Sequence, residues 1–496
     1  MRVSAMTLSA DRDTHCAPVA GEYGAVSAGH PLAVAAGTSV LAEGGSAVDA
    51  AIAAQAVTCV CMPHSAGLGG DMLALVREAG GEVFSVNGTG RSGLAAEAIT
   101  STGGASVTVP GLVAGWVHAH RRWGRLTLAR VLSDAIRIAR QGFDIDSSLV
   151  LARDQQRERL VAGGAENWPL LRLDAGDLWR QEELARFLTD IADSKGESFY
   201  TGSAVAAMTD AVQRSGGSLT ARDFELHTTQ ASTPVTVDFD GGRLSVQPPS
   251  SQGVLLALAA TAAERLIPTV PENSRDHLLV EITEAVFAHR SECGDAESVL
   301  AQQISVDPER AAHRGGPRAY LHTAGVAAAD ASGMVVSSLV SVFDDFGSCV
   351  FVPELGISLN NRAAGFTDGA NAAGPGKRPV HTLAPALLQR SDGSVLAMAT
   401  PGADGQVQTL LQILVALGDG EPLGAAIAAP RWRSENNQLM IERDHLQRGD
   451  LGSRGHHLKE LQPGNDLFGA VVAAGFSDGK PFAAADWRRQ VSAAGI

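Results

Sequence analysis

The stretch HTAGVAAADASGMVVSSLVSVFDDFG, residues 322–347, decides how the rest of the chain is interpreted. Small apolar and β-branched residues fill 324–329 and 334–343, and a short polar turn that contains Gly333 separates them. Runs of this kind on both sides of a glycine turn predict two paired strands. Taken alone, Thr323 is only the polar residue at which the first strand begins.

The flanking sequence predicts a mixed structure in which strands become more frequent after residue 322. Before the hairpin we expect a polar loop at 296–322, a β-hairpin with a Gly-Gly turn at 233–253, and helices at 181–194, 203–214, 253–266 and 275–295. After it we expect helices at 404–418 and 421–429 and strands at 348–352, 387–399, 438–442 and 468–474, the last two closing the chain. This order predicts a layered α+β architecture with helices outside sheets.

Composition and charge exclude several classes of protein. The chain has 496 residues, of which 45% are hydrophobic and 19% charged, as in a globular protein with an ample core. Its formal charge of -15 argues against nucleic acid and anionic membranes as partners. The sequence has neither a run of 18 apolar residues nor a secretory signal at its start, so we expect a cytoplasmic protein. The five cysteines lack metal-type spacing, which predicts free thiols.

Two glycine-rich turns are candidate anion-binding elements. They are GLGGD at 67–71 and TPGADGQ at 400–406, and such turns offer backbone N–H groups to an anion or an oxyanion. Neither has the spacing of a dinucleotide motif or a P-loop. The chain also lacks the G-x-S-x-G elbow and the H-E-x-x-H zinc motif, and its histidines are scattered, so no cofactor and no metal are expected.

A series of motifs downstream of Thr323 changes the interpretation of that residue. In order, they are Asp330, Gly333, Phe346-Gly347, Val350, Pro353, Gly356-Ile357, Leu359-Asn360-Asn361 and Phe366. This series resembles the start of the catalytic small subunit of the γ-glutamyltransferase family, and counting back from Asp330 puts Thr323 at the family's nucleophile. Matches to other family blocks, VPGLVAGW at 109–116, QPPSSQG at 247–253 and RPVHTLAPALL at 378–388, extend the resemblance over nearly the whole chain.

The resemblance implies an N-terminal nucleophile hydrolase with a four-layer αββα sandwich. It implies that a precursor cuts itself between His322 and Thr323, leaving a large-subunit region at 25–322 and a small catalytic-subunit region at 323–496. The polar, unpatterned residues 1–24 are expected to form a loose arm ahead of the large-subunit region. The two pieces would remain one intertwined domain, and a homodimer of such processed heterodimers is compatible with the resemblance. A freed α-amino group titrates near ~8, so it is suited to take the proton of the neighbouring hydroxyl. One cleavage therefore creates a nucleophile and its base on the same threonine.

The resemblance also assigns roles to other residues. Ser341 falls where a hydroxyl hydrogen-bonds the nucleophile's amine, and Gly402 and Ala403 fall where backbone amides form the oxyanion hole. Alanine is compatible with that role because the backbone N–H does the work. Asn361 is expected to support the wall of the site.

The departures from the family pattern concern the substrate. Gly365 and Phe343 stand where the family has an aspartate and an asparagine that bind the γ-glutamyl group, and His381-Thr382 replace a Ser-Ser pair. A buried ammonium without a counter-charge is costly, so a γ-glutamyl donor fits poorly. Arg91 and Arg362 are the candidates to bind a small carboxylate, unless they are surface arginines.

We therefore expect hydrolysis, through an ester on Thr323, of a small carboxylate-bearing substrate. The bond is an amide, as in the family's acylase and oxamate-amidohydrolase-like branch, or an activated C–C bond next to a carbonyl, as proposed for members in actinobacterial secondary metabolism. Two alternatives stay open. One is a true γ-glutamyl transferase or hydrolase acting on glutathione-like donors. The other is an inactive binding or scaffold homologue, which Ala324 and Gly325 after the nucleophile keep in play.

Overall fold

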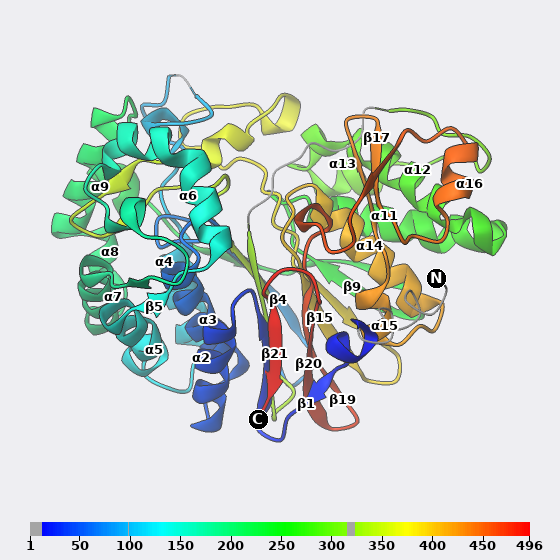
Figure 1. Ribbon diagram of the computed structural model, residues 1–496, viewed down its shortest axis with the longest axis horizontal. Coiled ribbons are helices and arrows are strands. Elements are labelled where there is room, and N and C mark those ends of the chain that lie inside the picture. Colours follow the sequence, from blue (N-terminus) through cyan, green and yellow to red (C-terminus); the bar gives the residue numbers. More distant parts are fainter. Residues whose placement is uncertain (1–11, 98, 315–322) are drawn as a thin grey trace.

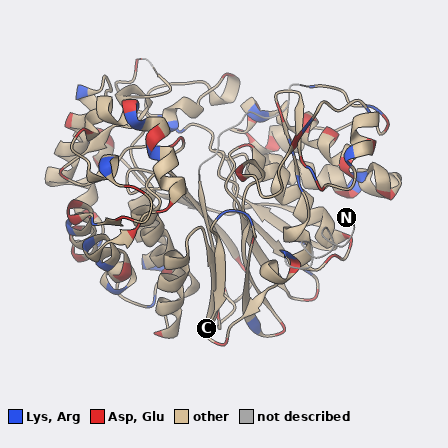
Figure 2. Cartoon of the chain, viewed as in Figure 1, with Lys and Arg blue, Asp and Glu red and all other residues tan. Residues whose placement is uncertain are grey.

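Two antiparallel sheets stand face to face in the middle of the molecule, and helices cover the outer face of each (Figure 1). The computed structural model describes residues 12–97, 99–314 and 323–496. The αββα order of layers predicted from the sequence is confirmed. Charged residues gather on the outer helices and loops, whereas the strands in the middle carry few (Figure 2).

The first sheet, called here the Thr323 sheet, contains the hairpin that follows Thr323. Its strands in order are β21 (Ser492–Gly495), β2 (Gly24–Ala28), β10 (Ala324–Asp330), β11 (Val335–Ser341), β3 (Asp71–Arg77), β4 (Val83–Gly88) and β7 (Gln230–Ser232). The β10–β11 turn contains Gly333 at φ 84°, a backbone conformation that favours glycine. The Asp330 carboxylate accepts hydrogen bonds from the backbone of Ser332 and Met334 and fixes this turn. Thr323 therefore lies at the opposite, open end of the hairpin.

The second sheet, called here the facing sheet, packs on the first through small side chains. Its strands in order are β1 (Val19–Ala20), β20 (Lys480–Ala485), β19 (Val472–Ser477), β15 (Val395–Ala399), β14 (Ala386–Gln389), β9 (Gly242–Val246) and β8 (Val235–Phe239). Ala327, Leu339 and Ala397 belong to the core between the sheets. A Cβ on Gly325 would lie 3.2 Å from the Cβ of Ala399, so the sheets approach closely near Thr323.

Helices from the first half of the chain cover the Thr323 sheet. They are α2 (Pro31–Ala42), α3 (Ala47–Cys61), α4 (Leu112–Trp123), α5 (Leu128–Gln141), α6 (Ser147–Leu160), α7 (Glu182–Asp193), α8 (Glu197–Tyr200), α9 (Gly202–Arg214) and α10 (Ala221–Glu225). A capping box between Ser46 and Asp49 starts α3, every residue of which is buried. The two-stranded pairs β5 (Phe143–Asp144) with β6 (Leu178–Trp179) and β12 (Phe351–Val352) with β13 (Ile357–Ser358) complete this side.

Helices from both sides of residue 323 cover the facing sheet. They are α11 (Gly253–Leu266), α12 (Arg275–Phe287), α13 (Ala296–Leu300), α14 (Gly405–Gly418), α15 (Leu423–Ala428) and α16 (Arg448–Ser453). The small sheet of β16 (Trp432–Glu435), β17 (Gln438–Glu442) and β18 (Leu458–Leu461) packs beside them. None of the helices in the described part of the chain is long and apolar enough to cross a membrane.

The structure corrects several expected elements. The helix expected at 275–295 ends at Phe287, because Arg290 turns away to pair with Asp404 at 3.1 Å. The loop expected at 296–322 contains α13. The turn expected at Gly-Gly in the β8–β9 hairpin is Asp240-Gly241, both at positive φ, as a two-residue turn requires. Strands β20 and β21 follow the pair that was expected to close the chain, and their alanine-rich sequences carry little β-propensity.

The structure also bears on two further expectations, the state of the cysteines and the N-terminal segment. All five cysteines are free thiols, as predicted, and all are buried. The described end of the segment 1–24 is held in the fold, because Val19 and Ala20 pair with β20 and Arg12 forms an ion pair with Asp444 at 2.6 Å.

Candidate active site

Thr323 lies buried at the start of β10, with 4% of its surface exposed. Ala324 pairs with Val340 on β11, so the next position outward sets Thr323 opposite Ser341, which in turn pairs with Asp71 on β3. Residues two apart on a strand share a face, and Gly325, Leu339 and Leu73 face the opposite sheet. Thr323, Ser341 and Asp71 therefore project between the two sheets at the same end.

The turn after β15 brings the facing sheet's contribution to this end. Gly402 and Ala403 have φ values of 121° and 49°, and both are buried. The carbonyl of Ala403 accepts a hydrogen bond from Nε2 of Gln252 at 2.8 Å. Within the described ranges, no acceptor is found for the backbone N–H of either residue. Buried N–H groups are rarely left without a partner, so these two donors are available to an incoming acceptor.

Arg362 is a buried charged side chain that contacts Asp71. It is completely buried, its Nε donates to Oδ2 of Asp71 at 3.1 Å, and its guanidinium lies 4.7 Å from the centre of the Phe343 ring. Nη1 and Nη2 have no hydrogen-bond partner among the described residues. Burial lowers the pKa of Arg362 and raises that of Asp71 to about 6, while the attraction between the two opposes both shifts.

His381 lies beside Arg362 and shares its lack of partners. Its side chain is fully buried, and neither ring nitrogen has a partner in the described part of the chain. Burial, with the nearby charges of Arg362 and Arg378, lowers its pKa well below the usual value, so the ring is neutral at pH 7. The next residue, Thr382, accepts a hydrogen bond through its carbonyl from Gln252, which links this pair to the turn at Ala403.

The remaining predicted residues take different places. Asn361 lies next to Arg362 in the chain, and its amide donates to Asp344 at 2.7 Å and to the carbonyl of Ser101 at 2.9 Å, so it braces the surrounding loops. Arg91 is exposed and donates to the carbonyl of Gly376 at 3.1 Å, outside the Arg362–His381 pair. His322, on the other side of the expected cut, lies outside the described residues.

Thr323 also borders a cavity of about 300 Å³. Other polar residues that line it, none of them singled out from the sequence, include His30, His64, Asp146, Gln155, Asp466 and Arg489. Arg362 and His381 are not among its lining residues. Thr323 thus has two polar neighbourhoods: this cavity, and the adjoining ends of β11 and β3, where Asp71 accepts a hydrogen bond from Arg362.

Sequence reasoning missed two residues that organise the site. Asp71 supplies the counter-charge of Arg362, and Gln252 ties Thr382 to Ala403. Each had a signal, because Asp71 ends the GLGGD turn and Gln252 lies in the QPPSSQG block. The sequence could not show the partner of either residue. Arg362 lies 291 positions after Asp71, and Ala403 lies 151 positions after Gln252.

Comparison with known proteins gives a consistent result. The family model described as gamma-glutamyltranspeptidase matches residues 33–496. The chain is 31% identical over 448 residues to the oxamate amidohydrolase proenzyme of Klebsiella pneumoniae, covering 83% of this chain and 85% of that protein. It is 29% identical over 528 residues to the acylase ACY 1 proenzyme of Pseudomonas sp. (strain V22), covering 95% and 93%. The crystal structure of cephalosporin acylase from Bacillus halodurans matches with a TM-score of 0.85 at 26% identity, over 97% of each chain.

Proposed function

The chain belongs to the gamma-glutamyltranspeptidase family of N-terminal nucleophile hydrolases, and from this premise we propose that it is a self-processing threonine hydrolase of small carboxylate-bearing metabolites. Thr323 is the nucleophile, and processing separates 1–322 from 323–496. Water completes both the processing and each turnover. The relatives named as proenzymes support the processing step.

The proposed mechanism follows from the groups around Thr323. After processing, the free α-amine of Thr323 takes the proton from its own hydroxyl, whose oxygen attacks the substrate carbonyl. The N–H groups of Gly402 and Ala403 stabilise the oxyanion, and Ser341, opposite Thr323, orients the amine. The leaving group takes the proton back, an ester remains on Thr323, and water hydrolyses that ester.

One observation supports the substrate class: within the described part of the chain, both Nη atoms of buried Arg362 and both ring nitrogens of His381, whose pKa the charge of Arg362 lowers, lack hydrogen-bond partners. A carboxylate satisfies both Nη donors in a bidentate pair. A γ-glutamyl amino group has no equivalent partner here, because the Phe343 ring covers Arg362 and lies 3.7 Å from where a Cβ on Gly365 would be. The best-supported substrates are therefore short acids with a carbonyl close to the carboxylate, such as oxamate-like amides and oxalyl-type ketones.

Several parts of the proposal rest on sequence alone. They are the choice between amide and activated C–C bonds, a role in secondary metabolism such as antibiotic biosynthesis, a cytoplasmic location, and a homodimer of processed heterodimers. In the same proposal, Thr382 and Asn361 shape the pocket, and Arg91 guides acidic substrates from the surface.

The test combines processing with a substrate panel. Denaturing electrophoresis and mass spectrometry of the wild type should show two fragments divided before residue 323, whereas Thr323→Ala should stay one full-length chain. Activity on oxamate and on an oxalyl-type ketone should exceed activity on a γ-glutamyl anilide by at least ~100-fold. Loss of a buried charge pair costs about 3 kcal/mol, which corresponds to a factor of this size. Equal activity on the γ-glutamyl anilide would refute the substrate class, and an uncut wild type would refute the nucleophile.

A further inference from the structure

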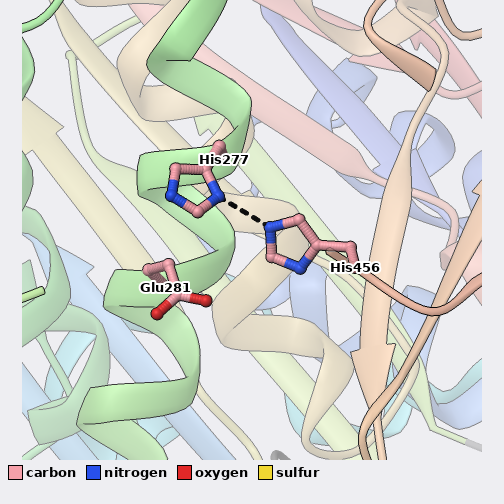
Figure 3. Close-up of side chains that lie close together, drawn as sticks. All are labelled: His277, Glu281 and His456. Atoms are coloured by element: carbon pink, nitrogen blue, oxygen red, sulfur yellow. Dashed lines mark hydrogen bonds between the residues drawn. The ribbon is translucent and has the colours of Figure 1, made fainter. Parts of the chain in front are cut away.

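A second polar cluster lies on the other side of the molecule, between α12 and the loop before β18. It consists of His277 and Glu281 on α12 and His456, all three of which are buried. One ligand atom from each lies within 4.8 Å of the others. None of the three lines the cavity beside Thr323. Figure 3 shows the two imidazoles pointing at each other, with Glu281 one turn further along the helix.

We propose that His277 Nδ1, His456 Nε2 and the Glu281 carboxylate bind a divalent transition metal ion, of which Zn²⁺ fits the donor set best. Two imidazole nitrogens and one carboxylate oxygen are a common zinc set, and solvent completes the four-coordinate shell. Sequence reasoning predicted no metal because only the helical spacing of His277 and Glu281 is local. The third ligand comes 179 positions after His277.

The orientation of His277 prepares it as a ligand. Its Nε2 lies 3.0 Å from the carbonyl oxygen of Asp307, which can only accept a hydrogen bond. The proton therefore sits on Nε2, and the lone pair of Nδ1 points at Nε2 of His456, 2.8 Å away. A second hydrogen bond from a metal-binding imidazole to a carbonyl is the usual way in which proteins fix this tautomer.

Binding requires a small rearrangement. The ion replaces the hydrogen bond between the two imidazoles, and His456 then carries its proton on Nδ1 instead of Nε2. Tetrahedral zinc with Zn–N near ~2.0 Å holds two nitrogens about 3.3 Å apart, so the rings must separate by about 0.5 Å.

Glu281 retains acceptor capacity for the ion. Its two oxygens accept from the backbone N–H of Ala312 at 3.1 Å and from Nη1 of Arg314 at 2.6 Å. Each carboxylate oxygen has two lone pairs, so each retains one. The ion would thus be held next to residues 312–314, the described end of the segment that leads to Thr323.

The site joins two parts of the chain that the proposed self-cleavage would separate. His277 and Glu281 belong to the region before residue 323, and His456 to the region after it. This consequence rests on the proposed function, whereas metal binding itself does not. We infer that the ion fastens the turn after α16, and with it the small-subunit region, to α12.

The experiment uses the full chain freed of metal by a chelator and titrated with Zn²⁺ alone, and with Co²⁺ for its absorption spectrum. The wild type should bind one ion per chain with a tetrahedral Co²⁺ spectrum, and its thermal midpoint should rise with Zn²⁺. His456→Ala should weaken binding by at least ~100-fold, more than loss of a supporting group does. His457→Ala is the matched control, because this exposed neighbour lies outside the cluster and should bind as the wild type does.

Each outcome decides the proposal. Absence of stoichiometric binding by the wild type, or equal binding by His456→Ala, overturns it. Should His456→Ala not fold, Glu281→Gln replaces it, and unchanged Zn²⁺ affinity and Co²⁺ spectrum in that variant also overturn it. Thr323→Ala should bind the ion as tightly as the wild type, so failure of self-cleavage and failure of the metal site are seen separately.

Discussion

Arg488 and Arg362 are both completely buried, but their hydrogen bonds differ. The guanidinium of Arg488 contacts Asp486 at 3.1 Å, Glu442 through Nε at 3.1 Å and Nη2, and the carbonyls of Ile427 and Ala429. Among the residues that the structure describes, the guanidinium of Arg362 has a hydrogen-bond partner only for Nε, which donates to Asp71. Burial lowers the pKa of both, but at Arg488 the two carboxylates outweigh burial and raise it.

This difference separates an arginine whose donors are all used within the fold from one with two donors open to a ligand. Every donor of Arg488 is satisfied within the chain, so it has nothing to offer a substrate. Two donors of Arg362 are not, and a buried polar group without a partner costs about 1–3 kcal/mol, more if charged. The unpartnered donors of Arg362 lower the stability of the folded protein by this amount, and a bound carboxylate would remove the loss.

The largest expected effect is on stability, at Arg488. Arg488→Met should lower the free energy of unfolding by about 3–5 kcal/mol, because Asp486 and Glu442 would lose a buried counter-charge. The thermal midpoint measured by scanning calorimetry checks this. Arg362→Met is the matched control, since it strands only Asp71 and should cost less. An unchanged thermal midpoint in Arg488→Met would show that Arg488 does not stabilise the fold more than Arg362 does.

The next effect is on activity, at Arg362. Arg362→Lys keeps the charge but loses the planar pair of Nη donors, so kcat/KM for an oxamate-like substrate should fall by ~10–100-fold, chiefly through KM. The thermal midpoint should stay near that of the wild type. Arg489→Lys, in the cavity beside Thr323, is the control. A larger loss of kcat/KM in Arg489→Lys than in Arg362→Lys would indicate that the carboxylate binds in that cavity and not at Arg362.

The contrast between the two arginines could not have been predicted from sequence, although much of the fold could. Long periodic segments such as α11 and α14, and the β10–β11 hairpin, were placed to within one or two residues because their patterns are local. The motif series likewise led to Thr323. The sequence gives Arg362 and Arg488 the same chemical identity, and only folding sets two carboxylates around one and a single carboxylate beside the other.

The elements that were missed share a physical cause. Strands β20 and β21 are alanine-rich and are held by pairing with β19 and β2, and α12 ends at Phe287, shortly before Arg290 pairs with Asp404. The cavity beside Thr323 collects Asp146, Asp466 and Arg489 from distant parts of the chain. In each case a tertiary contact decides the outcome, and no window of local sequence contains it.

The smallest expected effect is a pH dependence set by Asp71. Burial raises its pKa from 3.8 to about 6, so its ionised form disfavours folding, and its contribution to stability is greatest below about pH 4 and declines until about pH 6. A substrate carboxylate competes with ionised Asp71 for Arg362, and like charges this close favour the protonated acid. Non-reacting Thr323→Ala should therefore bind oxamate more tightly as the pH falls from 7 to 5, by up to ~10-fold.

The pH dependence of oxamate affinity distinguishes the two possible carboxylate sites, Arg362 and the cavity beside Thr323. Burial lowers the pKa of His381 well below its usual value. Asp71, which accepts a hydrogen bond from Arg362, is therefore the first candidate to titrate beside this arginine, and Asp344, whose pKa burial also raises, is the second. Asp71→Asn in the Thr323→Ala background keeps an oxygen acceptor for Nε and removes the titration, so oxamate affinity should become nearly independent of pH. Calorimetric titration at three pH values measures both variants. A dependence that survives Asp71→Asn but disappears in Asp344→Asn would assign the titration to Asp344, and one that survives both changes would mean that the carboxylate binds away from Arg362.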